Sequence, residues 1–276
     1  MILLYCVIGV VLMQNFNYHG HTKRCGHADN NLLDEDYVKK FISMGFKKIA
    51  FTDHCPEKNR IDTRDNMRMD YTELNDYLNS INYLKNKYKD KIGILSGFEV
   101  EYLDVLEDEI IDLKKKCDMI VLGQHFIHKD GNLKMFRKHA FSDMDLLKYG
   151  ECVVSAIKKG IPDIVVHPDI YMVSRSEMGD IEEKVARMIC EAAERYHVIL
   201  EINLSEPYFY MNGYIDKISY PCVDFWKIVS EYKLDVLYGI DAHCLGQIDR
   251  YPDLVKFVND LFGVELINKL NFLEEA

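Results

Sequence analysis

The stretch that organises this chain is Tyr18-His19-Gly20-His21-Thr22, which is followed within one short loop by Cys25-Gly26-His27. Alternate side chains of an extended segment share a face, so His19 and His21 project in the same direction. Neutral imidazole is a good ligand for zinc, iron and manganese. The spacing therefore predicts part of a metal site, and it favours this interpretation over a polar loop that happens to be rich in histidine.

The composition is that of an ordinary soluble protein. The 276 residues suffice for one large α/β domain with a substantial core. The 45 acidic and 34 basic residues give a net charge of −11, which argues against sequence-independent binding to nucleic acid or to an anionic membrane. Eight scattered cysteines without a CxxC pair indicate reduced thiols and a cytoplasmic location.

The first twelve residues are an apolar run that is too short to span a bilayer. The run lacks the basic n-region and the small-residue cleavage site of a signal peptide. We expect residues 1–12 to be an extension that is not part of the native domain, and residues 13–276 to form a single domain.

Apolar runs of strand length alternate seven times with segments of helical periodicity. The expected strands cover residues 15–19, 48–52, 92–98, 119–123, 163–166, 198–203 and 235–240. The expected helices cover residues 31–44 and 71–88, a segment ending near 115, and residues 143–159, 180–195, 223–231 and 254–262. This alternation predicts a parallel sheet with crossover helices.

Polar side chains follow the carboxyl end of every expected strand. In a (β/α) barrel these ends converge on one face, where the active site is built. An open doubly wound sheet would also place ligands beyond its strand ends, but seven strands that contribute to one cluster favour a distorted TIM-like (β/α)7 barrel. The residues concerned are His19, His21, Asp53, His54, Glu99, His125, His167, Asn203, Asp241 and His243.

With His27, seven histidines and the carboxylates of Glu99 and Asp241 give nine candidate metal ligands. Nine ligands are too many for one tetrahedral zinc ion, which takes four. They could serve two or three metals if a carboxylate bridges, and Glu99 on a middle strand is the natural bridge. Neighbouring metals lower the pKa of a bound water and clamp the oxygens of an in-line displacement at phosphorus. The cluster therefore predicts hydrolysis of a phosphate ester.

The ordered string HxH…H…TDH…GxExE…H…HPD…DAH, from Phe16 to at least Gly246, resembles the PHP (polymerase and histidinol phosphatase) family, most closely its histidinol-phosphatase branch. The resemblance implies a distorted seven-stranded barrel with three divalent metal ions, which could be zinc, iron or manganese. It also implies that Asp53 lies behind the ligands and orients either its neighbour or a ligand imidazole. By motif, it assigns three ligand sets: His19, His21, Glu99 and Asp241; Glu99 as a bridge, with His125 and His167; and His27, His54 and His243.

The same resemblance implies a metal-dependent phosphoric monoester hydrolase with a small phosphorylated substrate. The leading candidate substrate is histidinol phosphate, an intermediate of histidine biosynthesis. Glu99 and Asp241 would be catalytic within the metal centre, and Arg175 would neutralise the phosphate. The branch carries a second basic residue after the sixth strand, where this chain reads Asn203-Leu204-Ser205-Glu206-Pro207. Other candidate phosphate anchors are Lys23, Arg24, Arg64 and Arg137.

Several alternatives stay open at this level. The substrate could be a nucleotide, a sugar phosphate or a phosphotyrosine peptide. Amidohydrolase-type enzymes also open with HxH, but they usually use a bridging lysine, and no expected strand ends in one here. A non-catalytic metal-binding or regulatory module would show losses among the ligands, and the sequence shows none. Glu101 could face either the site or solvent, and the oligomeric state is open.

Overall fold

The structure is a computed structural model that describes residues 13–58, 67–129, 132–137 and 139–274. The predictions about the apolar run 1–12 and about Arg64 fall outside the described residues. Within them, no helix is both long enough and apolar enough to cross a bilayer. The cytoplasmic location stays a prediction.

Eight parallel strands form one curled sheet, in the order β1-β2-β3-β4-β7-β8-β9-β10. An antiparallel hairpin of β5 and β6 stands apart from it. The expected parallel, TIM-like arrangement with outer helices is confirmed. The strands are β1 (Phe16–Asn17), β2 (Lys48–Phe51), β3 (Gly93–Val100), β4 (Met119–Leu122), β5 (Phe126–Lys129), β6 (Asn132–Met135), β7 (Ile164–Val165), β8 (Ile199–Asn203), β9 (Asp235–Gly239) and β10 (Asn271–Phe272).

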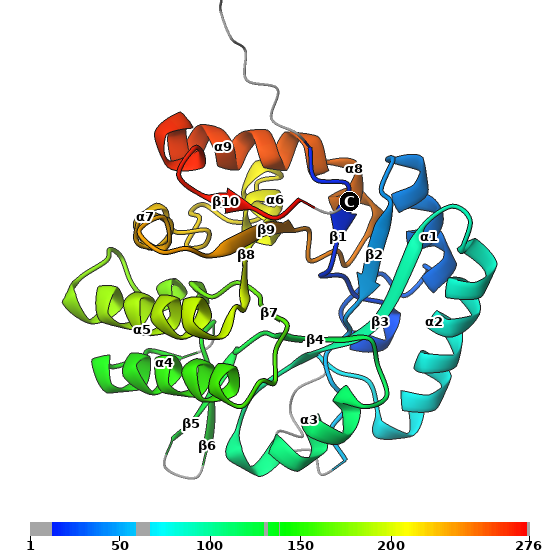
Figure 1. Cartoon of the computed structure of the whole chain (residues 1–276), viewed down its shortest axis with the longest axis horizontal. Helices are drawn as coiled ribbons and strands as arrows, with labels where there is room; N and C mark the ends of the chain where they lie inside the picture. The colour runs from blue at the N-terminus through cyan, green and yellow to red at the C-terminus, as the bar shows by residue number, and fades with distance from the viewer. Residues whose placement is uncertain (1–12, 59–66, 130–131, 138, 275–276) are drawn as a thin grey trace, which may run out of the picture.

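The helices surround the curled sheet on its outer side (Figure 1). Local sequence sets their ends: at α4, for example, the Ser142 side chain accepts a hydrogen bond from the backbone N–H of Asp145, as an N-cap residue does. The helices are α1 (Asp34–Ser43), α2 (Leu74–Tyr88), α3 (Glu107–Lys114), α4 (Asp143–Lys158), α5 (Asp180–Tyr196), α6 (Ser205–Met211), α7 (Val223–Val229), α8 (Leu245–Asp249) and α9 (Tyr251–Ile267).

The sequence did not predict five of these elements: the strands β5 and β6 of the hairpin, the short helices α6 and α8, and the strand β10. β10 pairs in parallel with β9, Asn271 opposite Asp235. These elements are two to seven residues long, which is too short for a period of 2 or 3.6 to show. Strand β10 adds an eighth member to the seven expected strands.

The two faces of each strand pack into different clusters. Val121 belongs to a small inner cluster, whereas its neighbours Ile120 and Leu122 belong to the large core beneath the helices. This division follows from the alternation of side chains along a strand. Glu99 pairs in register with Val121, so its side chain shares the inner face. The inner cluster consists of Phe16, Tyr18, Ala50, Met119, Val121, Ile164, Val166 and Leu237.

The sheet curls until its first and ninth strands meet at their carboxyl ends. Gly20 forms a parallel bridge with Ala242. The backbone N–H of His21 donates to the Ala242 carbonyl at 2.9 Å, and that of Asp241 donates to the His19 carbonyl at 3.0 Å. This contact brings residues more than two hundred positions apart to one site.

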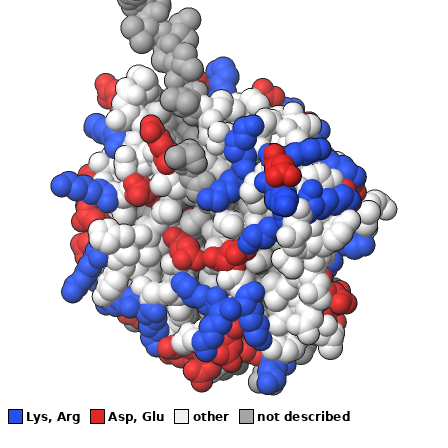
Figure 2. Space-filling model, turned by 45° about the vertical axis from the view of Figure 1, so that its right-hand side comes forward, with Lys and Arg blue, Asp and Glu red and all other residues white. Residues whose placement is uncertain are grey.

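Both signs of charge are interspersed on the face of the molecule shown in Figure 2. Elsewhere, Arg187 on α5 contacts the carboxylates of Glu183 and Glu231 at 2.8 Å. The expectation that the chain binds no nucleic acid stays a prediction.

Candidate metal centre

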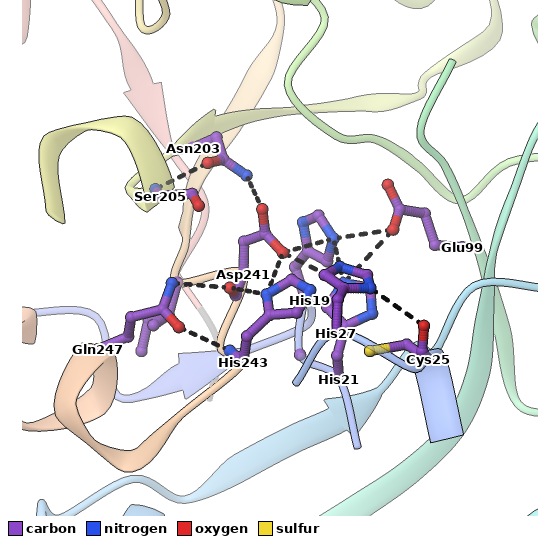
Figure 3. Close-up of polar contacts among 12 residues, drawn as sticks. His19, His21, Cys25, His27, Glu99, Asn203, Ser205, Asp241, His243 and Gln247 are labelled. Carbon is purple, nitrogen blue, oxygen red and sulfur yellow. Dashed lines mark hydrogen bonds and ion pairs between the residues drawn. The ribbon is translucent and has the colours of Figure 1, made fainter. Parts of the chain in front are cut away.

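Four side chains from three distant segments meet at the mouth of the curled sheet (Figure 3). They are His19 and His21 after β1, Glu99 on β3 and Asp241 after β9. Five separations among the Nε2 atoms of the imidazoles, Oε2 of Glu99 and Oδ1 of Asp241 lie between 3.1 and 3.5 Å. Ligands about 2.0–2.1 Å from a tetrahedral zinc ion lie roughly 3.4 Å from one another. The spacing of these atoms fits a single metal ion.

A buried carboxylate fixes the orientation of His19. Nδ1 of His19 lies 2.8 Å from Oε2 of Glu201 on β8. An ionised carboxylate only accepts hydrogen bonds, so Nδ1 carries a proton, and in the neutral ring Nε2 presents its lone pair. Against the cost of burial, the Glu201, Asp241 and Glu99 carboxylates raise the pKa of His19 well above its ordinary value.

Sequence reasoning missed Glu201. The signal was available: a charged residue interrupts the apolar run of its strand, two positions before Asn203, and therefore shares that residue's face. The Glu201 side chain is fully buried, and it accepts a hydrogen bond from the Asn203 amide at 2.7 Å.

The second predicted ligand set gathers around the other oxygen of Glu99. Oε1 of Glu99 lies 3.0 Å from Nε2 of His167 and 3.6 Å from Nε2 of His125. Glu99 thus directs its two oxygens to different sets of imidazoles, which is the geometry that a bridging carboxylate requires. Nδ1 of His125 lies 2.7 Å from Oε1 of Glu101. Glu101 is therefore buried behind a predicted ligand, which decides between its two open interpretations.

The third predicted set comprises His27, His54 and His243, with ligand atoms within 4.8 Å of one another. Nδ1 of His27 donates to the Cys25 carbonyl at 3.1 Å, and Nδ1 of His243 donates to the Asp241 carbonyl at 2.9 Å. A carbonyl only accepts, so both rings leave Nε2 bare. Burial, helped by neighbouring His21, lowers the pKa of His243 to about 4, which leaves the imidazole neutral near pH 7.

The donor atoms fit a group of metal ions. Oε2 of Glu99 and Nε2 of His243 are buried and form no hydrogen bond with the described residues. Buried polar atoms are almost always satisfied in native proteins. The rings of His21 and His243 stack with centroids 4.2 Å apart, so imidazoles from the two ends of the chain crowd into one small volume. Imidazole and carboxylate together suit zinc, iron or manganese.

Glycines on neighbouring strands make room for the buried carboxylates. A Cβ atom at Gly123, just after β4, would lie 1.8 Å from Oε1 of Glu99. A Cβ atom at Gly239 on β9 would lie 2.1 Å from Oε2 of Glu201. Real Cβ atoms never approach heavy atoms so closely, so the two glycines are part of the architecture of the site.

Of the three non-glycine residues with a positive φ among those described, two are predicted ligands. His167 has φ 33° and Asp241 has φ 53°, in the left-handed region that L side chains rarely adopt. Such outliers persist only where the surrounding structure determines them, and they cluster at functional sites. Here they turn both side chains toward Glu99 and the first imidazoles at the ends of their strands.

Asp53 lies behind the cluster, where its carboxylate contacts Thr22. Its Oδ1 accepts hydrogen bonds from the backbone N–H and the hydroxyl of Thr22, at 2.8 and 3.2 Å. Burial raises the pKa of Asp53 to about 7, and the bonds from Thr22 oppose that rise. Asp53 therefore fixes the chain directly after His21, and no described hydrogen bond joins it to an imidazole.

Arg175, the predicted phosphate ligand, is not brought into the cluster by any described contact. Its guanidinium contacts Glu182 at 2.5 Å, Asp143 at 2.8 Å and the Phe141 carbonyl at 2.7 Å. These contacts connect the beginnings of α4 and α5. Its role toward phosphate stays a prediction.

Two further candidate phosphate anchors have defined partners. Arg24 contacts both oxygens of Asp34 at 2.8 Å. Arg137 donates to the Tyr220 hydroxyl at 2.7 Å and contacts Glu206 at 2.9 Å. Lys23 is exposed at the start of the short 3-10 helix between His21 and His27.

Comparisons with known proteins agree with the fold. A Bacillus subtilis histidinol-phosphatase is 28% identical over 48% of this chain, and the chain spans about half (52%) of that relative's length. A Schizosaccharomyces pombe protein named "Probable histidinol-phosphatase" is 24% identical, covering 89% of this chain and 86% of its own. The solved histidinol phosphate phosphatase of Lactococcus lactis, in complex with zinc, L-histidinol and phosphate, superposes with a TM-score of 0.64 at 18% identity, covering 88% of this chain and 93% of its own.

A match to a family model decides to which family the chain belongs. The model of the PHP domain matches residues 17–205, which is more than half of the chain and includes Glu99 and the first six histidines of the cluster. The match begins where β1 leads into His19 and His21, and it extends through β8. The chain belongs to the PHP domain family.

Proposed function

We propose that the chain is a metal-dependent phosphatase that hydrolyses a small phosphomonoester, with histidinol phosphate as the leading substrate. The observation that carries the proposal is the 3.1–3.5 Å spacing of four donor atoms from His19, His21, Glu99 and Asp241. The names of the Bacillus subtilis and Schizosaccharomyces pombe relatives support it. So does the zinc, L-histidinol and phosphate complex of the Lactococcus lactis neighbour.

Different residues of the chain have different roles in the proposed site. Glu99 offers one oxygen to each of two ligand sets, while Glu201 and Glu101 hold His19 and His125 in the tautomer that leaves Nε2 free. Metal ions bound here would supply an acidified water and positive charge beside the phosphoryl oxygens. Asp241 joins the first set through its side chain and fixes His243 through its carbonyl.

We propose three metal ions, because the nine predicted ligands separate into three groups that share Glu99. Elemental analysis of metal-replete protein should give close to three ions per chain. A count of one or none would instead favour a non-catalytic metal-binding module.

The functional test is a phosphatase screen of the metal-replete chain against histidinol phosphate, nucleotides and sugar phosphates. Glu99→Gln should abolish turnover of an aryl phosphate, because a neutral amide cannot replace a carboxylate shared between two cations. Glu183→Gln, an exposed change on α5, is the matched control. Full turnover in Glu99→Gln would overturn the bridging role.

One observation favours a second candidate, a PHP phosphatase for a nucleotide, sugar phosphate or phosphotyrosine peptide. The segment after β8 carries Glu206, which is 2% exposed, where the histidinol-phosphatase pattern implies a basic residue. If histidinol phosphate is turned over no faster than unrelated phosphomonoesters, this second candidate replaces the first.

A further inference from the structure

Three polar side chains form a connected group that the metal centre does not use. Nη2 of Arg137 donates to the Tyr220 hydroxyl at 2.7 Å and lies 2.9 Å from Oε1 of Glu206. The guanidinium carbon lies 5.4 Å from the centroid of the Tyr220 ring. The three residues come from the segment after β6, the start of α6 and the segment before α7.

This group borders two predicted metal ligands. The backbone N–H of Phe136, the residue before Arg137, donates to the carbonyl of His125 at 3.1 Å. The ring of Tyr220 contacts the ring of His167, with centroids 5.9 Å apart. Arg137 is thus joined through one neighbour to His125 and through another to His167, the two imidazoles that face Oε1 of Glu99.

Contacts with Glu206 and Tyr220 fix the position of the Arg137 side chain. Oε2 of Glu206 accepts backbone hydrogen bonds from Ser219 at 2.6 Å and from Tyr220 at 3.1 Å. These bonds fix the Glu206 carboxylate, and the carboxylate and the Tyr220 hydroxyl together fix Nη2. A guanidinium oriented in this way loses less conformational entropy when it binds a ligand.

Arg137 also keeps N–H donors that Arg175 does not, because Arg175 uses its Nε, Nη1 and Nη2 in contacts with the protein. The Arg137 side chain is 40% exposed, against 16% for Arg24 and 19% for Arg175. Among the described residues, the hydrogen bond from its side chain comes from Nη2, and none comes from Nε or Nη1. A guanidinium with several open N–H groups matches the oxygens of a phosphate, which it can bind in a bidentate manner.

We propose that Arg137 is the residue that binds the phosphate group of the substrate, and that Tyr220 and Glu206 are positioning residues that hold it beside His125 and His167. The inference rests on the proposed phosphatase function. It places the main cationic contact of the substrate on the segment after β6, and assigns no such contact to the segment after β8.

The test uses Arg137→Met and Arg137→Lys in the metal-replete full chain, with inorganic phosphate as the probe. Arg137→Met should weaken phosphate binding in calorimetry by about 10–100-fold, the usual effect of losing charge-assisted hydrogen bonds. It should raise KM for an aryl phosphate more than it lowers kcat. Arg137→Lys should recover part of the loss. The metal content should equal that of the wild-type chain.

Two further variants test the supporting residues. Tyr220→Phe removes one hydroxyl and should raise KM by a smaller factor, with kcat and metal content nearly unchanged. Arg187→Met is the control: this arginine is also held by side-chain partners, here the carboxylates of Glu183 and Glu231, but it lies on α5, so phosphate binding should not change.

The outcomes separate the inference from the function on which it rests. Wild-type phosphate binding in Arg137→Met, with full metal content, would overturn the inference even if the chain is a phosphatase. If the metal-replete wild-type chain binds phosphate through Arg137 but hydrolyses no phosphomonoester, the proposed function fails and the inference stands. If the wild-type chain neither binds phosphate nor hydrolyses phosphomonoesters, both fail.

Discussion

Glu201 on β8 lies 2.8 Å from Nδ1 of His19, although 182 positions separate the two residues in the sequence. Both side chains are 1% exposed. The carboxylate fixes the tautomer and the direction of the imidazole, so that Nε2 faces Glu99 and Asp241. Partners of this kind behind metal-binding histidines strengthen the ligand and are costly to replace.

Glu201→Gln should weaken the metal held by the His19 set by about 10–100-fold. The amide keeps the size of the side chain but loses the charge that stabilises the proton on Nδ1. Competition with a chelator, followed by elemental analysis, measures the affinity directly. Asp118→Asn is the matched control, because Asp118 is a half-exposed carboxylate that contacts Lys85 and Ser96. Equal chelator resistance in Glu201→Gln and the wild type would contradict the assigned role.

Gly239→Ala should destabilise the protein by about 1–3 kcal/mol, the usual cost of overpacking, because its Cβ would lie 2.1 Å from Oε2 of Glu201. Gly20→Ala is the matched comparison. Although Gly20 lies between His19 and His21, a Cβ there would meet atoms no closer than 3.7 Å. Urea unfolding of both variants measures the difference, and equal loss in the two would show that the clash with Glu201 is not the cause.

Removal of the metals should lower the thermal midpoint by several degrees, and re-addition of zinc or manganese should restore it. Binding to the folded chain alone adds about 2.7 kcal/mol per site at a hundredfold excess over Kd. In domains of about this size, each kcal/mol shifts the midpoint by roughly 2–4 °C. Calorimetry with and without a chelator measures the shift. An unchanged midpoint, with confirmed loss of metal, would mean that the lost metal was not bound by this buried cluster.

Arg175→Met should lower the free energy of unfolding by about 1–2 kcal/mol, because the side chain joins the start of α5, at Glu182, to the start of α4. KM for an aryl phosphate should stay within twofold of the wild-type value. Arg195→Met, an exposed change near the end of α5, controls for the loss of an arginine. A raised KM with unchanged stability would instead support the phosphate role predicted from the sequence.

Much of the fold could be predicted because its signals are local. The expected strands at 48–52, 119–123 and 198–203 correspond to β2, β4 and β8 with ends shifted by one residue at most. The hairpin β5–β6 and the two-residue strand β10 carry no periodic signal. The positions of these strands are set by the register of the strand pairs and by the curl of the sheet. Both depend on segments elsewhere in the chain.

The sequence by itself determined the nature of the site. Imidazoles and carboxylates follow the ends of successive parallel strands, and parallel strands end on one face, so His19, Glu99 and Asp241 had to gather. Local order sufficed for that prediction, because strand direction and side-chain alternation are properties of short segments.

Only the tertiary structure decided which side chain supports which. The pairs His19 with Glu201 and His125 with Glu101, and the contact of Arg137 with Tyr220, depend on the curl of the sheet and on the loops that cross its mouth. Burial removes the competition of water, so a charged group in the interior must find its partner within about 3 Å. That distance is fixed by packing across strands far apart in the sequence.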